Sequence, residues 1–390
     1  MSERVSELDG VRGIACLLVL ADHVIVSGLP PRTLPGIGRL FPWLIGGVDL
    51  FFVLSGFLIG GILLDNRSAT NYFRAFWLRR IARIWPVYYL LVFSFFAVVV
   101  ARPIIPAPWL DRFLLKDAMP LWTYPTFLQN FAQGASGLDG GARWVASTWS
   151  LAIEEQFYLL LPPLVLLMSR RGITVLAVVC VLGAWPLRTL LQVETGTWTD
   201  GYFLLPGRMD SLGAGLLAAI VLRTPEWMAV VRRLRPFLDG LAVATVLFLL
   251  GNGLILLTKV LPSPGALLAA NVDFTLRSVL FAWGILRVFA VSETSRYRRA
   301  LNLRLFTFTG FISYSLYMYH PVINGLFHGW AFADVPHIPD GPHLLLAIAV
   351  IAASYLCAWV STTCMEIPIR RLAHRARFRH SSSIPEEVTA

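Results

Sequence analysis

Residues 46–64 read GGVDLFFVLSGFLIGGILL, an apolar run in which Asp49 is the one ionisable side chain. A helix of about 20 such residues crosses the hydrocarbon core of a bilayer, which is about 30 Å thick. The run therefore predicts a transmembrane helix. This prediction decides the class of the fold, because the rest of the chain repeats the pattern.

Ten segments meet the same test of length and apolarity, and we expect an all-α, polytopic membrane bundle of about ten transmembrane helices. The composition agrees, since 56% of the 390 residues are hydrophobic and only 14% are charged, against about 25% charged in soluble domains. No small-residue cleavage site follows the first segment, so we interpret it as a retained helix and not a signal peptide. The segments are 11–29, 46–64, 81–100, 153–169, 173–191, 201–222, 237–258, 268–290, 306–327 and 343–366.

The basic residues give the orientation. Most of the 33 Lys and Arg side chains lie in every second loop, and the positive-inside rule places those loops, with both termini, in the cytoplasm. The net charge of +10 thus indicates a membrane protein, and no motif or basic domain points to nucleic acid. The preference for arginine over lysine favours a GC-rich bacterium, so we expect the cytoplasmic membrane of a bacterium.

We divide the chain into a transmembrane domain, 1–368, and a basic, then polar, cytoplasmic tail, 369–390, which we expect to be disordered. The outer loop 101–152 carries several tryptophans, which are typical either of a lid over an outward-facing site or of an aromatic belt at the headgroups. The four cysteines lie in apolar segments without metal or redox spacing, so we expect small core residues and no metal site. Those cysteines are Cys16, Cys180, Cys357 and Cys364.

Ionisable groups are rare within membranes and normally face the protein interior with a partner or a function. At 1.5 Å per residue, His23 and His320 lie about 18 and 20 Å above the inner ends of their helices. Arg208 and Asp210 enter from the outer side and reach a similar depth, and Asp49 and Glu154 open their segments at the outer end. Together these groups supply a general base close to an anion-binding site.

Three arginines lie at the inner edge. Arg12 opens the first segment, and Arg80 and Arg83 open the third, where a spacing of three places them on one helix face. Guanidiniums at one depth are suited to bidentate phosphate binding. Ordinary positive-inside anchoring is the alternative.

Simpler explanations exist for the other groups as well. A histidine within a membrane is often a hydrogen-bonded packing residue. Glu154 and Glu155 suit a helix N-terminus, where the dipole stabilises carboxylates, and Arg208 with Asp210 suits a structural ion pair.

These residues fall in runs that resemble the membrane-bound acyltransferase-3 family, in its standalone form without an appended esterase-like domain. The resemblance extends in order from Leu8 to Pro368, and its departures are small: Trp85 where tyrosine is common, and Asp22 before His23. The runs are LDGVRGIACLLVLADH (8–23), the run quoted above, RRIARIWPVYYL (79–90), STWSLAIEEQFYLLLP (147–162), GRMDSLGAGLLAA (207–219), ISYSLYMYHPV (312–322) and MEIP (365–368).

The resemblance implies an O-acyltransferase that uses acyl-CoA, usually acetyl-CoA, as a cytoplasmic co-substrate, with no tightly bound cofactor. Arg12, Arg80 and Arg83 would then hold the phosphates, and His23 would meet the thioester near mid-membrane. The implied acceptor is a hydroxyl of a surface polysaccharide, a lipid-linked sugar, peptidoglycan or a glycosylated metabolite such as a macrolide. The sequence leaves the acceptor, the acyl length and the oligomeric state open.

Our hypothesis is that neutral His23 acts as the general base, with Glu154 or Asp49 orienting it as in a catalytic triad. Arg208 or His320 would stabilise the oxyanion or position the sugar. Four residues complete the acceptor side: Asp210, Trp149, Ser150 and Tyr314. Direct transfer and an acyl-enzyme relay both fit.

Two other classes of function remain. A proton-coupled transporter also uses buried histidines and carboxylates, but it predicts inverted repeats, and we find no such symmetry. A non-catalytic membrane scaffold would leave the buried charges without a purpose.

Overall fold

The computed structural model describes residues 5–29, 41–104, 107–136, 141–257, 264–373 and 376–380. Every regular element in these residues is helical, as the sequence predicts. The helices are α1 (Ser6–Leu20), α2 (Phe41–Asp65), α3 (Tyr72–Ala101), α4 (Gln129–Ser136), α5 (Thr148–Leu167), α6 (Arg170–Thr195), α7 (Thr199–Phe203), α8 (Leu205–Leu222), α9 (Pro225–Leu257), α10 (Pro264–Ala290), α11 (Arg296–Leu301), α12 (Arg304–Phe332), α13 (Gly341–Ser361) and α14 (Ile367–Ala373).

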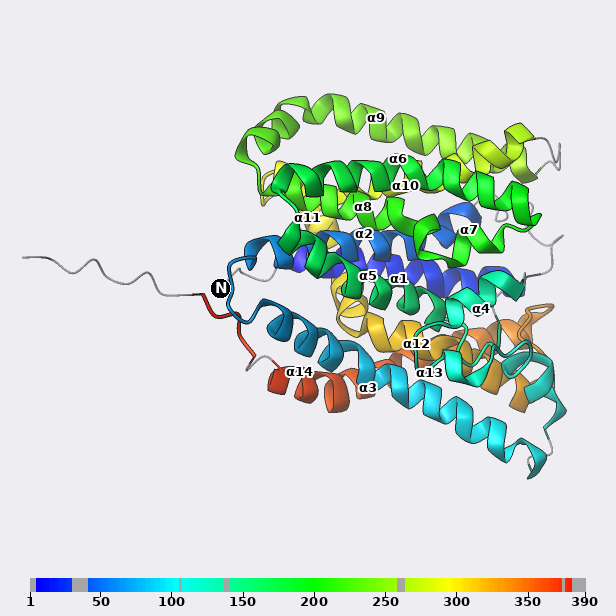
Figure 1. Cartoon of the computed structure of the whole chain (residues 1–390). Helices are drawn as coiled ribbons and strands as arrows, with labels where there is room; N and C mark the ends of the chain where they lie inside the picture. Colours follow the sequence, from blue (N-terminus) through cyan, green and yellow to red (C-terminus); the bar gives the residue numbers. More distant parts are fainter. Residues whose placement is uncertain are drawn as a thin grey trace, which may run out of the picture.

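Eight helical stretches of the described residues are long and apolar enough to cross a membrane: Ser6–Gly28, Gly46–Asp65, Tyr72–Ile104, Thr148–Leu167, Arg170–Thr195, Leu205–Leu222, Pro225–Gly251 and Gly341–Ala373. The two other predicted spans correspond to α10 and α12, whose 27 and 29 residues run along the same bundle (Figure 1). The predicted span 201–222 is interrupted at Leu204, so that α7 forms a separate turn before α8.

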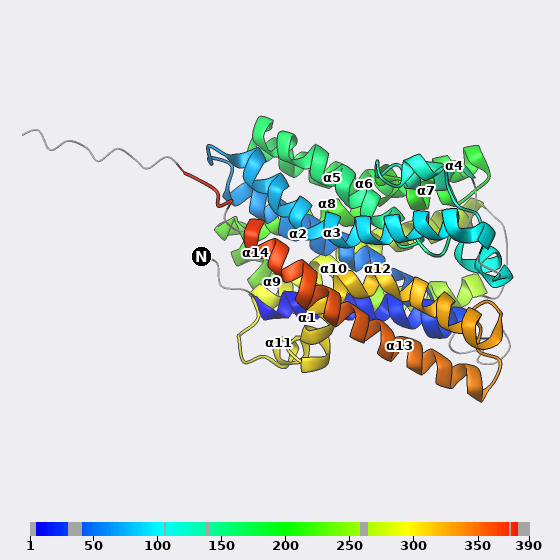
Figure 2. The same cartoon turned by 90° about the horizontal axis from the view of Figure 1, so that it is seen from below.

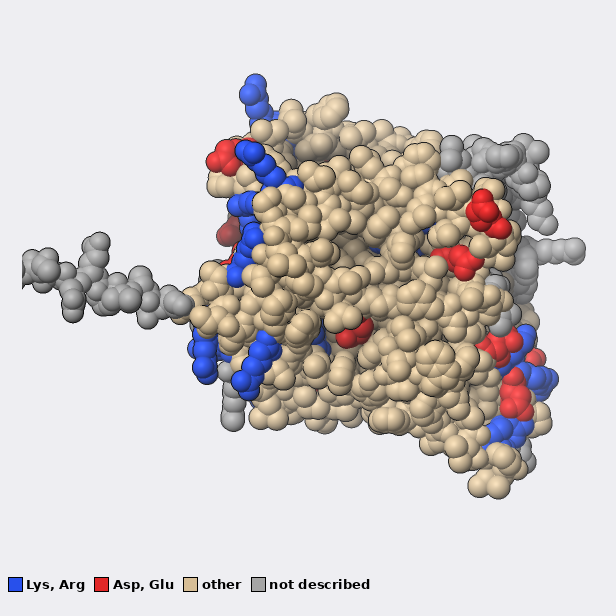
Figure 3. Space-filling model, viewed as in Figure 1, with Lys and Arg blue, Asp and Glu red and all other residues tan. Residues whose placement is uncertain are grey.

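The surface matches a bilayer. Figure 3 shows a broad belt with few charged side chains, and most of the visible arginine and lysine lies at one end of the bundle. Large apolar side chains point outward along this belt, among them Leu182, Phe237 and Leu345, which are 61, 68 and 69% exposed. Because α1 begins and α14 ends at the basic end (Figures 1 and 2), the positive-inside rule assigns that end to the cytoplasm.

Helices α1, α2, α8 and α12 form the centre of the bundle, with α1 packed along α12 and α2 packed along α8. Glycine allows the α1–α12 contact. A Cβ on Gly13 would lie 1.9 Å from the Phe306 carbonyl oxygen, and one on Gly310 would lie 1.9 Å from the Asp9 carbonyl oxygen. Small residues at helix interfaces permit such close backbone approach in membranes, and here they hold together the two helices that lead to His23 and His320.

The outer loop contains short turns and α4. Its tryptophans differ in environment: Trp144 is buried and donates to Ser94 Oγ at 3.0 Å, whereas Trp122 is 62% exposed. The lid and the aromatic belt both stay predictions for this loop.

The proposed boundary at residue 368 falls inside α14. Beyond α14, residues 377 and 379 form hydrogen bonds with the turn at residues 70 and 71. The remainder of the expected tail, 381–390, lies outside the described residues.

Candidate active site

His23 and His320 face each other between α1 and α12. The α1 helix continues into a single π-helical turn, Ala21–Ile25, which carries His23. His23 Nδ1 lies 2.8 Å from His320 Nε2, and the two rings are stacked with centroids 5.1 Å apart. Isolated π-helical turns within α-helices occur frequently at functional sites. The structure thus brings together the two histidines that the sequence placed at similar depth.

The hydrogen bonds assign the proton positions on two neutral rings. His320 Nδ1 lies 3.0 Å from the Leu316 carbonyl oxygen, which can only accept, so Nδ1 carries the proton. His320 Nε2 then holds a lone pair and accepts the Nδ1 proton of His23. The lone pair of His23 is consequently on Nε2. His320 is buried, whereas the His23 side chain is 37% exposed.

Asp22 is the nearest carboxylate to this lone pair. Its Oδ2 atom lies 3.9 Å from His23 Nε2, and the residue is buried. Our sequence reasoning treated Asp22 only as a departure from the family pattern. Its position directly before His23 was a signal that could have identified it.

Glu154 lies in a separate polar cluster. Ser55 Oγ donates to Glu154 Oε1 at 2.6 Å, and Tyr158 Oη donates to Glu154 Oε2 at 3.0 Å. Arg80 and Arg83 interact electrostatically with the same carboxylate. Among the described residues the partner of His23 is therefore His320, and the expected hydrogen bond from His23 to Glu154 or Asp49 is not present.

Asp49 and Arg208 form a buried ion pair. Arg208 Nη1 donates to Asp49 Oδ1 at 2.8 Å, and both side chains are almost inaccessible. Asp210 pairs with a different residue, Arg188, at 2.8 Å. The suggested Arg208–Asp210 ion pair is thus wrong in its partners, because the two side chains point to different neighbouring helices. Arg277 approaches Asp49 at 3.8 Å and extends the network.

Aromatic side chains connect these clusters. Trp149 packs against Tyr202, with ring centroids 5.0 Å apart, and its ring lies 5.8 Å from the Arg208 guanidinium. Ser150 Oγ lies 2.7 Å from Tyr317 Oη, and the Tyr317 ring contacts His320. Ser150 is thus linked to the histidine pair through a tyrosine that the sequence reasoning missed.

Tyr314 lies one turn below Tyr317 on α12. Its hydroxyl donates to the Ile84 carbonyl oxygen at 2.7 Å and joins α12 to α3.

The three inner arginines have different surroundings. Arg12 Nη1 lies 2.7 Å from Asp9 Oδ1, one turn away on α1. Arg80 and Arg83 lie close enough to interact electrostatically, and the buried Nε atom of Arg80 has no hydrogen-bond partner in the described residues. Glu154 interacts electrostatically with both arginines, and Glu155 interacts with Arg80. The unpartnered Nε atom of Arg80 is therefore the feature that points to a bound anion.

Comparison with known proteins gives one family. A family model described as an acyltransferase domain matches residues 5–363. Two relatives match along nearly the whole chain: the peptidoglycan O-acetyltransferase OatA of Listeria monocytogenes, 26% identical over 94% of this chain and 56% of its own length, and the O-acetyltransferase OatA of Staphylococcus aureus, 26% identical over 95% and 58%. The putative peptidoglycan O-acetyltransferase YrhL of Bacillus subtilis is 37% identical over 40% of this chain and 23% of its own.

The chain thus spans just over half the length of the two relatives that it matches from end to end. No solved structure matches it. Because the family model covers nearly all of its residues, this polytopic membrane protein belongs to the acyltransferase-3 family.

Proposed function

We propose that the protein transfers an acyl group, in the first place acetyl, from cytoplasmic acyl-CoA to a hydroxyl group of a sugar-containing acceptor. The observation that carries the proposal is the His23–His320 pair, which leaves the Nε2 lone pair of His23 available in a partly exposed side chain. A neutral imidazole held in one tautomer is the common general base of acyl transfer.

The reaction balances as a direct transfer. The acceptor oxygen attacks the thioester carbonyl carbon while His23 Nε2 removes the hydroxyl proton. The tetrahedral intermediate then collapses, the carbon–sulfur bond breaks, and the proton passes from His23 to the departing thiolate, so that the products are the ester and free CoA. An acyl-enzyme relay would need a nucleophile in addition to this base.

Two neighbours stabilise His23 when it becomes an imidazolium. His320 Nε2 accepts its Nδ1 proton at 2.8 Å, and Asp22 places a negative charge 3.9 Å from Nε2. An opposite charge within about 4–6 Å favours the charged form of a base. In this proposal His320 and Asp22 take the orienting and charge-stabilising roles that a triad gives to one carboxylate.

The donor enters at the basic end. Arg80 and Arg83 lie beside Glu154, and Arg80 also interacts electrostatically with Glu155. In this proposal the two arginines bind the CoA phosphates together with Arg12. The pantetheine arm then extends toward His23, about 18 Å along α1. On the acceptor side we assign Trp149 and Ser150 to the sugar, while the Asp49–Arg208 and Arg188–Asp210 pairs support the helices around it.

The relatives support the choice of acceptor class. One is named a peptidoglycan O-acetyltransferase and another a putative peptidoglycan O-acetyltransferase, which favours a sugar polymer. Lipid-linked sugars and glycosylated metabolites are the further members of the same class.

The test combines a defined acyl donor with an unbiased search for the acceptor. Cells with and without the gene are compared by mass spectrometry of surface glycans and secreted metabolites, and the purified protein in lipid nanodiscs is assayed for CoA release with the acceptor found. We expect ester groups that depend on the gene, and a loss of CoA release in His23→Ala but not in His337→Ala. Undiminished turnover of His23→Ala, or proton-dependent solute flux without CoA release, would overturn the proposal.

A further inference from the structure

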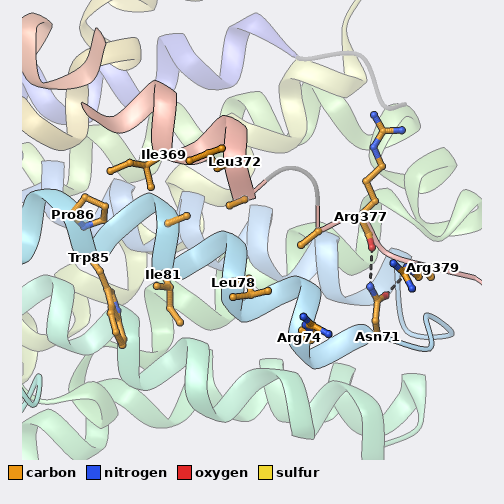
Figure 4. Close-up of a pocket in the computed structure, with 13 residues that line it drawn as sticks. Asn71, Arg74, Leu78, Ile81, Trp85, Pro86, Ile369, Leu372, Arg377 and Arg379 are labelled. Carbon is orange, nitrogen blue, oxygen red and sulfur yellow. Dashed lines mark hydrogen bonds between the residues drawn. The ribbon is translucent and has the colours of Figure 1, made fainter. Parts of the chain in front are cut away.

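A cavity of about 640 Å³ lies between α3 and α14, away from the histidine pair. Figure 4 shows its lining side chains on both helices, with Arg377 and Arg379 beyond the end of α14. Its volume falls in the range of small-molecule sites, about 300–1,000 Å³. The cavity is lined by Asn71, Arg74, Leu78, Ile81, Ala82, Trp85, Pro86, Ile369, Leu372, Ala373, Ala376, Arg377 and Arg379.

The two ends of the cavity differ in polarity. In Figure 4, Arg74, Arg379 and Asn71 are grouped at one end with the backbone of Arg377, whose side chain extends away from them. Trp85 lies with proline and isoleucine side chains at the other end. From Arg74 to Trp85 the α3 helix rises by about 16 Å. The cavity is therefore amphipathic along the membrane normal, with its basic end at the cytoplasmic face.

The basic end is held in place by backbone hydrogen bonds. The Arg379 carbonyl oxygen accepts from Thr70 N at 2.8 Å, and Arg379 N donates to Asn71 Oδ1 at 2.8 Å. Asn71 Nδ2 in turn donates to the Arg377 carbonyl oxygen at 2.8 Å. These bonds use the main chain of the segment and leave the guanidinium groups of Arg377 and Arg379 for other partners.

Those guanidiniums lack a counter-charge. No lining residue is acidic, and Arg74, Arg377 and Arg379 form no ion pair within the part of the chain that the structure describes. Arg79 adds a further cation nearby, since it interacts electrostatically with Arg377. Like charges gathered at one depth repel one another, and a bound anion relieves the repulsion.

This cavity is not the proposed donor site. At 100° per residue, Arg74, Ile81 and Trp85 share one face of α3, whereas Arg80 and Arg83 lie on the opposite face, beside Glu154 on α5. The helix itself separates the two groups of arginines. A substitution on one face can therefore be tested without changing the other.

We propose that the cavity binds one anionic phospholipid of the inner leaflet. Its phosphate accepts charge-assisted hydrogen bonds from Arg74 and Arg379, while Arg377 adds positive charge to the same end. The upper part of an acyl chain packs against Leu78 and Leu372. Basic pockets between transmembrane helices on the cytoplasmic side suit anionic headgroups, which the surface potential already concentrates there. The bound lipid would join α3 to the C-terminal segment.

The test measures lipid binding and requires no enzymatic activity. Purified, delipidated protein is titrated with phosphatidylglycerol, diphosphatidylglycerol or phosphatidylcholine, and bound lipid is counted by native mass spectrometry. The charge variant is Arg74→Gln with Arg377→Gln and Arg379→Gln. Its matched control, Arg232→Gln with Arg233→Gln and Arg235→Gln, removes the same charge from α9, outside the cavity. Ala82→Phe fills the cavity at constant charge, and thermal unfolding confirms that each variant is folded.

We expect one tightly bound anionic lipid in the native protein and the α9 control, with affinity reduced at least roughly tenfold in the charge variant and in Ala82→Phe, and weak binding of phosphatidylcholine throughout. Equal binding by the charge variant and its control would overturn the proposal, as would unchanged binding by Ala82→Phe, which would indicate surface attraction alone. Inorganic phosphate that binds as tightly as the lipid would identify a free-phosphate site. Displacement of the lipid by CoA would indicate that the cavity belongs to the donor-binding site. Either result would overturn the proposal of a phospholipid site.

Discussion

The two ring nitrogens of His23 have different surroundings, and this difference makes a single residue testable. Nδ1 donates to His320, while Nε2 lies 3.9 Å from Asp22 Oδ2. His320 acts on His23 through this one hydrogen bond, which fixes the tautomer of the His23 ring. His320 is therefore a positioning residue in our proposal, and its replacement should act on turnover more than on donor binding.

For His320→Phe we expect kcat to fall by a factor on the order of 10²–10⁴, the usual contribution of general-base catalysis, with KM for acyl-CoA nearly unchanged. His320→Gln restores an acceptor near the position of Nε2 and should recover part of kcat. The measurement is steady-state CoA release for both variants. An unchanged kcat in His320→Phe would show that the ring only fills space.

The Asp49–Arg208 pair gives a second prediction for individual residues. Removing one partner of a buried ion pair leaves an uncompensated charge and costs about 3–5 kcal/mol. We expect Asp49→Ala to lower the thermal unfolding temperature in detergent strongly, and Asp49→Leu with Arg208→Met to recover most of the loss. If Asp49→Ala unfolds like the native protein but loses activity, Asp49 acts in catalysis as the sequence first suggested.

At the level of helices, the sequence predicts the depth of a side chain in the membrane better than it predicts which side chains contact it. The rise per residue placed His23 and His320 at similar depth, and the structure shows that their side chains are also neighbours. The sequence alone does not predict which side chains at one depth face each other, because that depends on which helices are adjacent and how they are rotated. Arg208 consequently pairs with Asp49 on α2 and not with Asp210 on its own helix. Tyr317 was missed for the same reason.

The α1–α12 interface should control the distance between the histidines. Gly310→Ala places a methyl group against the Asp9 carbonyl oxygen and must move the helices apart, at a cost of about 1–3 kcal/mol. We expect lower thermal stability together with reduced kcat. Gly240→Ala on α9 is the matched control, since no atom lies within 4 Å of its added carbon, and alanine favours a helix over glycine by about 0.5–1 kcal/mol. Similar effects of both substitutions would contradict a specific role of the interface.

Considered as a whole, the molecule has two chemically distinct ends. One carries the clustered arginines, and the other carries both positive and negative side chains (Figure 3). The outer loop accordingly contains the Arg102–Asp111 ion pair. The hydropathy pattern anticipated this asymmetry, because both the spans and the positive-inside bias are readable from composition along the chain. The hydropathy pattern did not predict the cavity between α3 and α14, because two segments distant in sequence form it.

The asymmetry implies a direction for the reaction. If phosphates bind at the basic end and His23 lies about 18 Å above it, the donor and acceptor approach from opposite sides of the membrane. Acetyl-CoA added to sealed vesicles should then support transfer only when it has access to the basic face. The orientation is measured in a background where the four native cysteines are replaced by alanine, with Asp340→Cys or Thr294→Cys added. An impermeant maleimide should label Asp340→Cys from outside intact cells. It should label Thr294→Cys only after permeabilisation. Turnover with acetyl-CoA confined to the outer face would mean that both substrates enter from one side, and the inner arginines would then need another role.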